Sequence, residues 1–531
     1  MKALGRAIFL VIRISCVFFL LTACSGGGGG GGSDEPQPTP APAAPAATPT
    51  PAPTATPTPA PTATPTPTPT PHNATITGAV AGATAVAYNE DSGAEVARNA
   101  ASGTPKTFTF TIPTGASYKI YVIENAGADQ RIYPLYACNT NVFAFDGSSD
   151  FSIDLGYVNT VSGIAVPTNS LCVAGVTPGN EDPTVPADLA ASSLSSTNLA
   201  GTWYFNGLMV GSKSNGTSPF WFRGTTTIAP DGSAARSTFY SFGYSTPIQD
   251  SYEITDIWPS GVILPAFNLG RRMLTLNGQM TIGVDTDATP GDSAYYLLIS
   301  QRAGAAGSYA TADLEGVWRF QGLYVLQGAI PAGWSYGAYN IVADGSSAGG
   351  EFTTSGGTMT QGPFTFSIDP DTGVVSSGTT SFQGVMTQDK KMIVATLTTN
   401  TVINSTTYSI YNLIIYQKVS ASFTSADLQG VWNFHELIAG GNGTTEPRAW
   451  AYGHLTINGD EFTQTDVIAD NFVPPADTTY HAVITADGVV TLTDAPAPFP
   501  FHALMSDDKR MMISVSMNGN GEGYRLTVYQ R

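Results

Sequence analysis

The 531-residue chain has little charge, and least of all positive charge. Asp, Glu, Lys and Arg make up 12% of its residues, about half the ~25% that is usual in a soluble globular chain. Lys and Arg number 22 against 40 Asp and Glu, so the formal net charge is −18. Polyanionic partners require a basic surface, and this balance therefore excludes general nucleic-acid binding and docking on anionic lipid through a basic patch.

The chain is also poor in the residues from which catalytic and metal sites are usually built. It contains five His, namely His72 in a Pro-rich stretch and, after residue 430, His435, His454, His481 and His502. Their spacing matches no zinc-ligand motif, and the sequence holds no nucleophile elbow, phosphate loop or dinucleotide fingerprint. We therefore expect a protein that is not an enzyme and that uses no metal and no cofactor.

An apolar run opens the chain. Lys2 and Arg6 precede the segment Ile14–Leu21. A basic start followed by a short apolar segment is typical of a secretory signal, and this segment is too short to span a bilayer. The segment ends Leu-Thr-Ala and is followed by Cys24, a pattern that resembles the bacterial lipobox.

The lipobox resemblance implies that residues 1–23 are a signal peptide and that Cys24 carries palmitate-type acyl chains. Ser25 stands where an Asp would resemble inner-membrane retention, which favours the outer membrane. Several acyl chains give a stable membrane anchor. The expected location is the cell envelope, with the folded part facing the surface or the periplasm.

The segment 24–72 lacks the residues of a hydrophobic core. Gly26–Gly32 is uninterrupted glycine, and Pro36–Pro71 alternates Pro with Thr and Ala. Such composition stays disordered, with the Pro-rich part favouring polyproline II. We interpret the segment as a tether, with a proline-motif ligand for a recognition domain as the alternative.

Cysteine is scarce as well. Of four Cys, Cys16 falls in the signal peptide and Cys24 in the lipobox, so Cys138 and Cys172 remain. In an exported protein, two Cys without clustered His are interpreted by default as a disulfide.

Residues 73–177 alternate apolar and polar side chains with a period of two. The runs at 107–112 and 117–123 are clear strands, and turn residues separate about seven such runs, which favours a β-sandwich. The order of these runs resembles the carboxypeptidase-regulatory or transthyretin-like module, which implies an accessory domain without catalytic residues. A linker, 178–196, follows.

Three tandem repeats make up the remainder, at 197–303, 309–419 and 422–531. Each begins with Leu-x-Gly-x-Trp-x-Phe, has a second Trp, and ends on an apolar strand followed by Gln and a basic residue. In repeats one, two and three respectively, the first Trp is Trp203, Trp318 and Trp432, and the second is Trp221, Trp334 and Trp450. The closing basic residue is Arg302, Lys418 and Arg531 in the same order. Basic pairs before Met also recur, at 271–273, 390–392 and 509–511. Each repeat is long enough for its own core, so we expect separate domains on a string.

The closing strands show one apolar face that is the same in all three repeats, as in a half-buried antiparallel strand. About eight strands fit in each repeat, and an eight-stranded sheet usually closes, because closure removes its exposed edges. The predicted fold class is therefore all-β, with a disordered stalk, one sandwich and three antiparallel barrels. The Gly-x-Trp start and basic end resemble the calycins, the lipocalin and avidin-like barrels. This resemblance implies that the first Trp packs at the barrel end under the closing base.

The second Trp of each repeat can pack in a core or line a ligand-binding barrel mouth, and the sequence favours the core. We interpret the whole as a lipid-anchored envelope protein for non-catalytic binding or display, with tandem repeats giving avidity toward an extracellular or envelope macromolecule. The alternative is binding of a small hydrophobic ligand or saccharide inside the barrels. A filled interior favours display, and a cavity lined with aromatic side chains favours a ligand.

Overall fold

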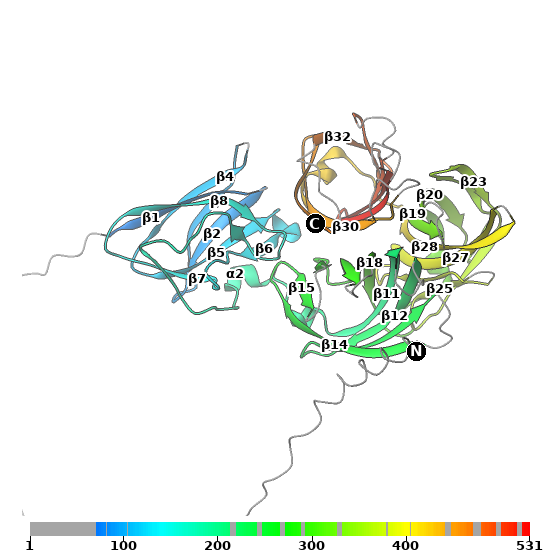
Figure 1. Cartoon of the computed structure of the whole chain (residues 1–531), viewed down its shortest axis with the longest axis horizontal. Coiled ribbons are helices and arrows are strands. Elements are labelled where there is room, and N and C mark those ends of the chain that lie inside the picture. Colours follow the sequence, from blue (N-terminus) through cyan, green and yellow to red (C-terminus); the bar gives the residue numbers. More distant parts are fainter. Residues whose placement is uncertain are drawn as a thin grey trace, which may run out of the picture. The chain divides into compact units, whose positions relative to one another are not determined.

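The computed structural model describes residues 71–531, with internal gaps at 81, 104, 213–218, 242–246, 266–270, 288–292, 327–331, 379–380, 404, 441–447, 471–478, 495–500 and 518–522. The described residues all belong to one compact unit, Pro69–Arg531. The signal peptide, Cys24 and the Gly- and Pro-rich tether lie outside the described residues. The fold is all-β, as predicted (Figure 1).

The first domain is a sandwich of two sheets. One sheet has the strand order β4 (Thr107–Pro113), β1 (Asn73–Ala79), β8 (Phe151–Asn159) and β9 (Val166–Pro167). The other has the order β10 (Val176–Pro178), β7 (Val142–Phe145), β5 (Ser117–Glu124), β2 (Ala83–Asn89) and β3 (Glu95–Ala100), with β6 (Arg131–Pro134) beside β5. Alternate side chains of both sheets, such as Ile76, Phe110 and Ile120, form the core between them.

The first and third repeats are closed eight-stranded barrels, and the third is seen end-on in Figure 1. The first comprises β11 (Gly201–Ser212), β12 (Phe220–Ile228), β13 (Ser233–Tyr240), β14 (Ile248–Ile257), β15 (Val262–Pro265), β16 (Arg271–Leu274), β17 (Met280–Asp287) and β18 (Ser293–Arg302). The third comprises β29 (Gly430–Ile438), β30 (Ala449–Asn458), β31 (Glu461–Asp470), β32 (Thr479–Ile484), β33 (Val489–Leu492), β34 (Phe501–Met505), β35 (Met511–Met517) and β36 (Tyr524–Gln530).

The second repeat departs from the predicted eight-stranded barrel, because its described residues form a ten-stranded sheet with two ends. The order is β21 (Ser346–Ser347), β24 (Phe364–Ile368), β25 (Val374–Ser377), β26 (Gln383–Met386), β27 (Met392–Ile403), β28 (Thr406–Lys418), β19 (Gly316–Leu326), β20 (Gly333–Ile341), β22 (Gly350–Thr354) and β23 (Gly357–Gln361). Gly349, with a φ of 79°, lies at the break in the strand that follows the turn, between β21 and β22. The part before the break, β21, pairs with β24, whereas β22 pairs with β20 and β23.

In the part of the chain that the structure describes, helical structure is confined to short turns. The longest described α-helix is α2 (Ala187–Ala190), and a 3₁₀ turn precedes each repeat: η2 (Ser196–Asn198), η3 (Thr311–Leu314) and η4 (Ser425–Leu428). None of the helices in the described part of the chain is long and apolar enough to cross a membrane.

The apolar face shared by the closing strands lies on the outside of the barrels. In the first repeat, Tyr296, Leu298 and Ser300 line the interior. The alternate residues of the same strand and their counterparts belong to one core shared by all three repeats: Tyr295, Leu297, Ile299, Tyr411, Leu413, Ile415, Tyr524, Leu526 and Val528. The repeated pattern therefore marks the surface through which the repeats pack on one another.

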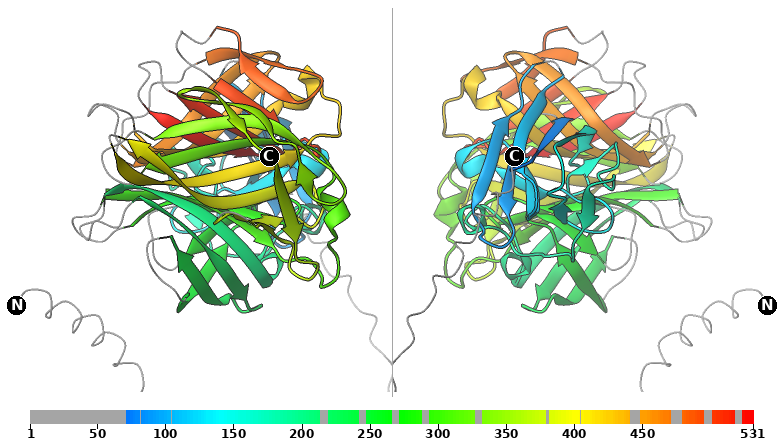
Figure 2. Two further views of the ribbon diagram at one scale, coloured as in Figure 1. Left: turned by 90° about the vertical axis from the view of Figure 1, so that its right-hand side faces the viewer. Right: turned by 90° about the vertical axis from the view of Figure 1, so that its left-hand side faces the viewer.

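The three repeats close into a ring. Strands β11 and β12 pack on β27 and β28, β19 and β20 on β35 and β36, and β29 and β30 on β17 and β18. Each repeat thus presents its first two strands to the last two strands of another, a head-to-tail contact that closes after three steps. Figure 2 views this unit from opposite sides, with the yellow strands of the second repeat toward the viewer on the left and the blue strands of the sandwich on the right. The prediction of separate domains on a string is therefore wrong, because the apolar outer faces would be exposed to water if the repeats separated.

Candidate functional site

The first Trp of each repeat is buried at one end of its sheet, beneath the 3₁₀ turn. Each indole N–H donates to the carbonyl of the Leu four residues earlier, at 2.7 Å for Trp203, 2.6 Å for Trp318 and 2.8 Å for Trp432. A buried Trp needs such a partner for its polar atom. The turn therefore acts as a plug that is fixed by the Trp.

The closing basic residue of each repeat lies over that Trp, at the place the calycin resemblance implies. Measured to the ring centroid, the distance is 4.5 Å from Arg302 to Trp203, 5.6 Å from the Lys418 Nζ to Trp318, and 4.4 Å from Arg531 to Trp432. These bases also donate to carbonyls of the plug: Arg302 to Ala200 at 2.6 Å, Lys418 to Asp313 at 3.1 Å and Arg531 to Gln429 at 2.7 Å. This end of each repeat is closed by packing and hydrogen bonds.

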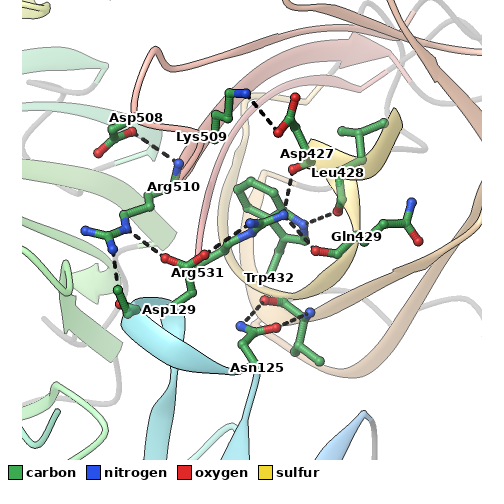
Figure 3. Close-up of polar contacts among 12 residues, drawn as sticks. Asn125, Asp129, Asp427, Leu428, Gln429, Trp432, Asp508, Lys509, Arg510 and Arg531 are labelled. Carbon is green, nitrogen blue, oxygen red and sulfur yellow. Dashed lines mark hydrogen bonds and ion pairs between the residues drawn. The ribbon is translucent and has the colours of Figure 1, made fainter. Parts of the chain in front are cut away.

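The plugged end of the third repeat also contacts the sandwich (Figure 3). Asn125 makes two hydrogen bonds of 2.9 Å with the backbone of Val431, and the Arg510 Nε donates to Asp129 at 2.8 Å. Arg131, which is 0% exposed, donates to the carbonyl oxygens of Ser260 at 2.6 Å and Arg531 at 2.5 Å. The sandwich is therefore joined to both the first and the third repeat.

A buried polar cluster adds to this contact. The His454 Nε2 lies 3.3 Å from a Glu124 oxygen and its Nδ1 lies 3.4 Å from an Asp466 oxygen. Glu124 also accepts from Tyr133 at 2.9 Å and from Thr160 at 2.6 Å. His454 and Glu124 are both 0% exposed, so this cluster joins two domains and is closed to a substrate.

The other His residues of the third repeat are dispersed. Burial lowers the pKa of His435 to about 3, with Arg131 adding to the effect, and burial lowers that of His502 to about 4. His481 is exposed, and its Nδ1 pairs with Asp494 at 2.7 Å. No group of three or more His, Cys, Asp or Glu within 71–531, gaps aside, is placed to hold a metal ion.

The second Trp of each repeat packs in a core, as the favoured interpretation predicted, but this core lies between repeats; the alternative of a ligand-binding mouth is wrong. Trp221, Trp334 and Trp450 are 4%, 6% and 3% exposed and belong to the shared core. The Trp221 Nε1 donates to Thr398 of the second repeat, and the Trp450 Nε1 to Thr286 of the first, both at 2.7 Å. They occupy outward-facing strand positions, and these are buried because the repeats form a ring.

The basic-pair landmark of the first repeat was also misplaced. Lys390 and Lys509 have φ of 61° in the turn before β27 and β35. The matching residue is Gly278, with φ of 67° before β17, and the following Met is Met280. A repeated bond from the preceding hydroxyl to the Met carbonyl confirms the match. The pair at 271–272 begins β16 instead.

The two remaining Cys are brought together as a disulfide. Cys138 and Cys172 lie with their Cα atoms 6.3 Å apart, in the loops of the sandwich. This bond crosslinks the domain and takes no part in a site.

The candidate site is a cavity of about 240 Å³ inside the first barrel. Its described lining combines aromatic rings, hydroxyl groups and two arginines: Trp203, Phe205, Phe222, Tyr240, Tyr252, Tyr296, Thr226, Thr238, Thr281, Ser300, Arg236 and Arg272. The sequence analysis named Trp203 only as a structural residue and Arg272 only as part of a basic pair, and it missed the others. An alignment of the three repeats could have found these residues, because the first repeat differs from the other two at positions that face into the barrel.

Comparison of equivalent positions explains why the first barrel is hollow. The inward residue opposite the plug-end Phe is Ser300 in the first repeat, but Tyr416 in the second and Tyr529 in the third. Opposite the first Trp stand Thr226, Tyr339 and Leu455. In the other repeats large side chains fill the interior, among them Phe320, Phe366, Phe382, Phe434, Phe462 and Met512.

No protein-family model and no curated protein matches the chain. Solved structures with some likeness include a protein of unknown function from the DUF3598 family of Nostoc punctiforme (11% identity, 62% of this chain and 95% of that chain, TM-score 0.17). Others are the transferrin binding protein TbpB of Neisseria meningitidis (9%, 62% and 76%, 0.19) and kievitone hydratase of Nectria haematococca (7%, 64% and 91%, 0.13). At these TM-scores the likenesses carry no argument about function.

Proposed function

We propose that the protein is a non-catalytic binding protein of the cell envelope, anchored by lipid on Cys24 and carried on the 24–72 tether. The ring of repeats and the sandwich form its head, and the first barrel is the binding chamber. The observation that supports this function is the hollow first barrel beside two filled repeats. Two filled repeats stabilise the head through packing, while the cavity offers space and polar groups to a ligand.

This proposal reverses the order of the two functions that the sequence favoured. Avidity through three equal repeats loses its basis, because the faces that repeat are buried in the ring. Display of the outer surface to a macromolecule remains the second candidate. It is favoured by the filled interiors of the second and third repeats.

The binding function is tested on the full chain extracted from the envelope of its own host. Denaturation should release about one equivalent of a small molecule, and that molecule should be recovered chemically unchanged after incubation with the emptied protein. Release of nothing, or conversion of the molecule, would contradict non-catalytic binding.

The anchor is tested separately by replacing Cys24. In a host that processes lipoproteins, Cys24→Ala should move the protein from the detergent-extracted membrane fraction to the soluble fraction, because the acyl chains supply the membrane affinity. A Ser25→Ala variant serves as the control and should stay in the membrane fraction. Equal membrane retention of the Cys24→Ala variant would overturn the lipid anchor.

A further inference from the structure

We propose that the cavity of the first barrel binds a small organic anion with an apolar or aromatic body, and that Arg272 holds the anionic group. This inference rests on the proposed binding function and names the class of its ligand.

The charge of the cavity is the first argument. Its described lining includes two arginines and no carboxylate, in a chain whose net charge is −18. Arg236 already has a counter-ion, since its Nε donates to Asp250 at 2.8 Å. Arg272 lies beside the hydroxyl of Tyr296, and that hydroxyl donates to the buried carboxylate of Asp285 at 2.8 Å. Among the described residues Arg272 itself forms no ion pair, and Asp285 approaches it through this neutral hydroxyl. Arg272 is therefore the lining group best able to attract an anion by a charge-assisted hydrogen bond.

The barrel also has space for the Arg272 side chain. Arg272 stands on β16 opposite Gly283 of β17, and its stem occupies the space where a side chain at position 283 would lie. The corresponding pairs are Gly384 with Ala395 in the second repeat and Ala503 with Ser514 in the third. A long basic side chain is thus directed inward only in the repeat that is hollow.

The rest of the lining determines the body of the ligand. The aromatic rings of Phe222, Tyr240 and Tyr252 are part of the lining and suit an apolar or planar group. The hydroxyl of Thr238 is buried, lines the cavity and has no hydrogen-bond partner among the described residues. An unsatisfied buried hydroxyl costs free energy, and a polar atom of a ligand would satisfy it.

The test is isothermal titration calorimetry on the full chain with two probes of the same shape, 2-naphthoate and its neutral analogue 2-naphthamide. The expected result is one site that prefers the anion by about tenfold or more, as one charge-assisted bond would give. Arg272→Ala, which installs the residue of the third repeat, should remove this preference. Arg272→Lys should retain most of it.

Two further variants keep the test decisive. Ser300→Tyr fills the cavity with the side chain found in the other repeats, and it should abolish binding of both probes. Arg98→Met removes an exposed arginine of the sandwich and should change neither affinity. Equal binding of the two probes would overturn the anionic class while leaving the binding function intact. Binding that survives Ser300→Tyr, or no binding to the wild type, would overturn the site.

Discussion

At the scale of single residues, the repeats act as controls for one another. Equivalent positions carry different side chains, and the structure shows the consequence of each difference. The Trp221 and Trp450 indoles each donate to a Thr of the neighbouring repeat. For Trp334 the equivalent residue is Met517, which offers no hydroxyl, and the Trp334 Nε1 has no hydrogen-bond partner among the described residues. One substitution thus decides whether a buried donor is satisfied.

This leads to a prediction about the Trp221 contact. Thr398→Val keeps the shape of the side chain but removes the acceptor, so the head should lose about 1–3 kcal/mol of unfolding free energy. Urea unfolding followed by Trp fluorescence measures the change. Thr365→Val, at an exposed position of β24, is the matched control and should be nearly neutral. A loss no larger than that of the control would refute the importance of the bond.

A second residue-scale prediction concerns pH. The pKa of His435 is about 3 in the folded chain against an ordinary value of 6.5, so the unfolded chain binds more protons between these values. Its contribution to stability is therefore complete above pH 6.5 and falls by about 1.4 kcal/mol per pH unit as the pH drops toward 3. Buried His502 acts in the same direction, while the raised pKa of His454 opposes it.

The variant His435→Gln carries the residue of the second repeat, Gln321, and should flatten the decline in stability between pH 6.5 and 4.5. Urea midpoints at three pH values measure this. His481→Gln is the control: the hydrogen bond to Asp494 raises the pKa of His481, which acts in the opposite direction, so this variant should not flatten the decline. An unchanged slope in the His435→Gln variant would mean that this His is not the neutral buried group described above.

For the strands, the sequence predicted the all-β class and the start of each repeat, which follow from period-two alternation and from Gly-x-Trp. The packing of the first Trp under the closing base was implied by the resemblance to the calycins. The sequence did not predict which face of the closing strand points inward, because Tyr295 and Tyr296 are equally compatible with a core. The direction depends on whether neighbouring repeats cover the outer face, which is a long-range property.

The sequence also did not predict the broken strand of the second repeat. The break lies at Gly349, and the sequence does not distinguish this Gly from the many others. Gly349→Ala should lower the stability of the head by about 1–3 kcal/mol, because its φ of 79° disfavours an L side chain and a Cβ would meet the Gln361 carbonyl. At Gly356, beside the same hairpin, a Cβ would make only an ordinary contact with the Thr354 hydroxyl at 3.7 Å, so Gly356→Ala should cost less. Thermal unfolding compares the two, and equal losses would contradict a special role for Gly349.

At the scale of the whole molecule, the head depends on contacts between domains. Arg131 is buried at the meeting point of the sandwich with the first and third repeats, where backbone carbonyls accept its hydrogen bonds. Arg131→Met would leave these carbonyls without a donor, at a cost of about 1–3 kcal/mol for each one left unsatisfied. Limited proteolysis should then release the sandwich from the ring, while Arg98→Met should leave the head intact. An equally resistant Arg131→Met head would show that the domains are held together elsewhere.

The three repeats form one cooperative body and not a string of domains. Differential scanning calorimetry of the full chain tests this cooperativity. The ring predicts that the repeats unfold in a single transition whose calorimetric and van't Hoff enthalpies agree, because separating them would expose the shared core. Separate transitions for the individual repeats would contradict the account.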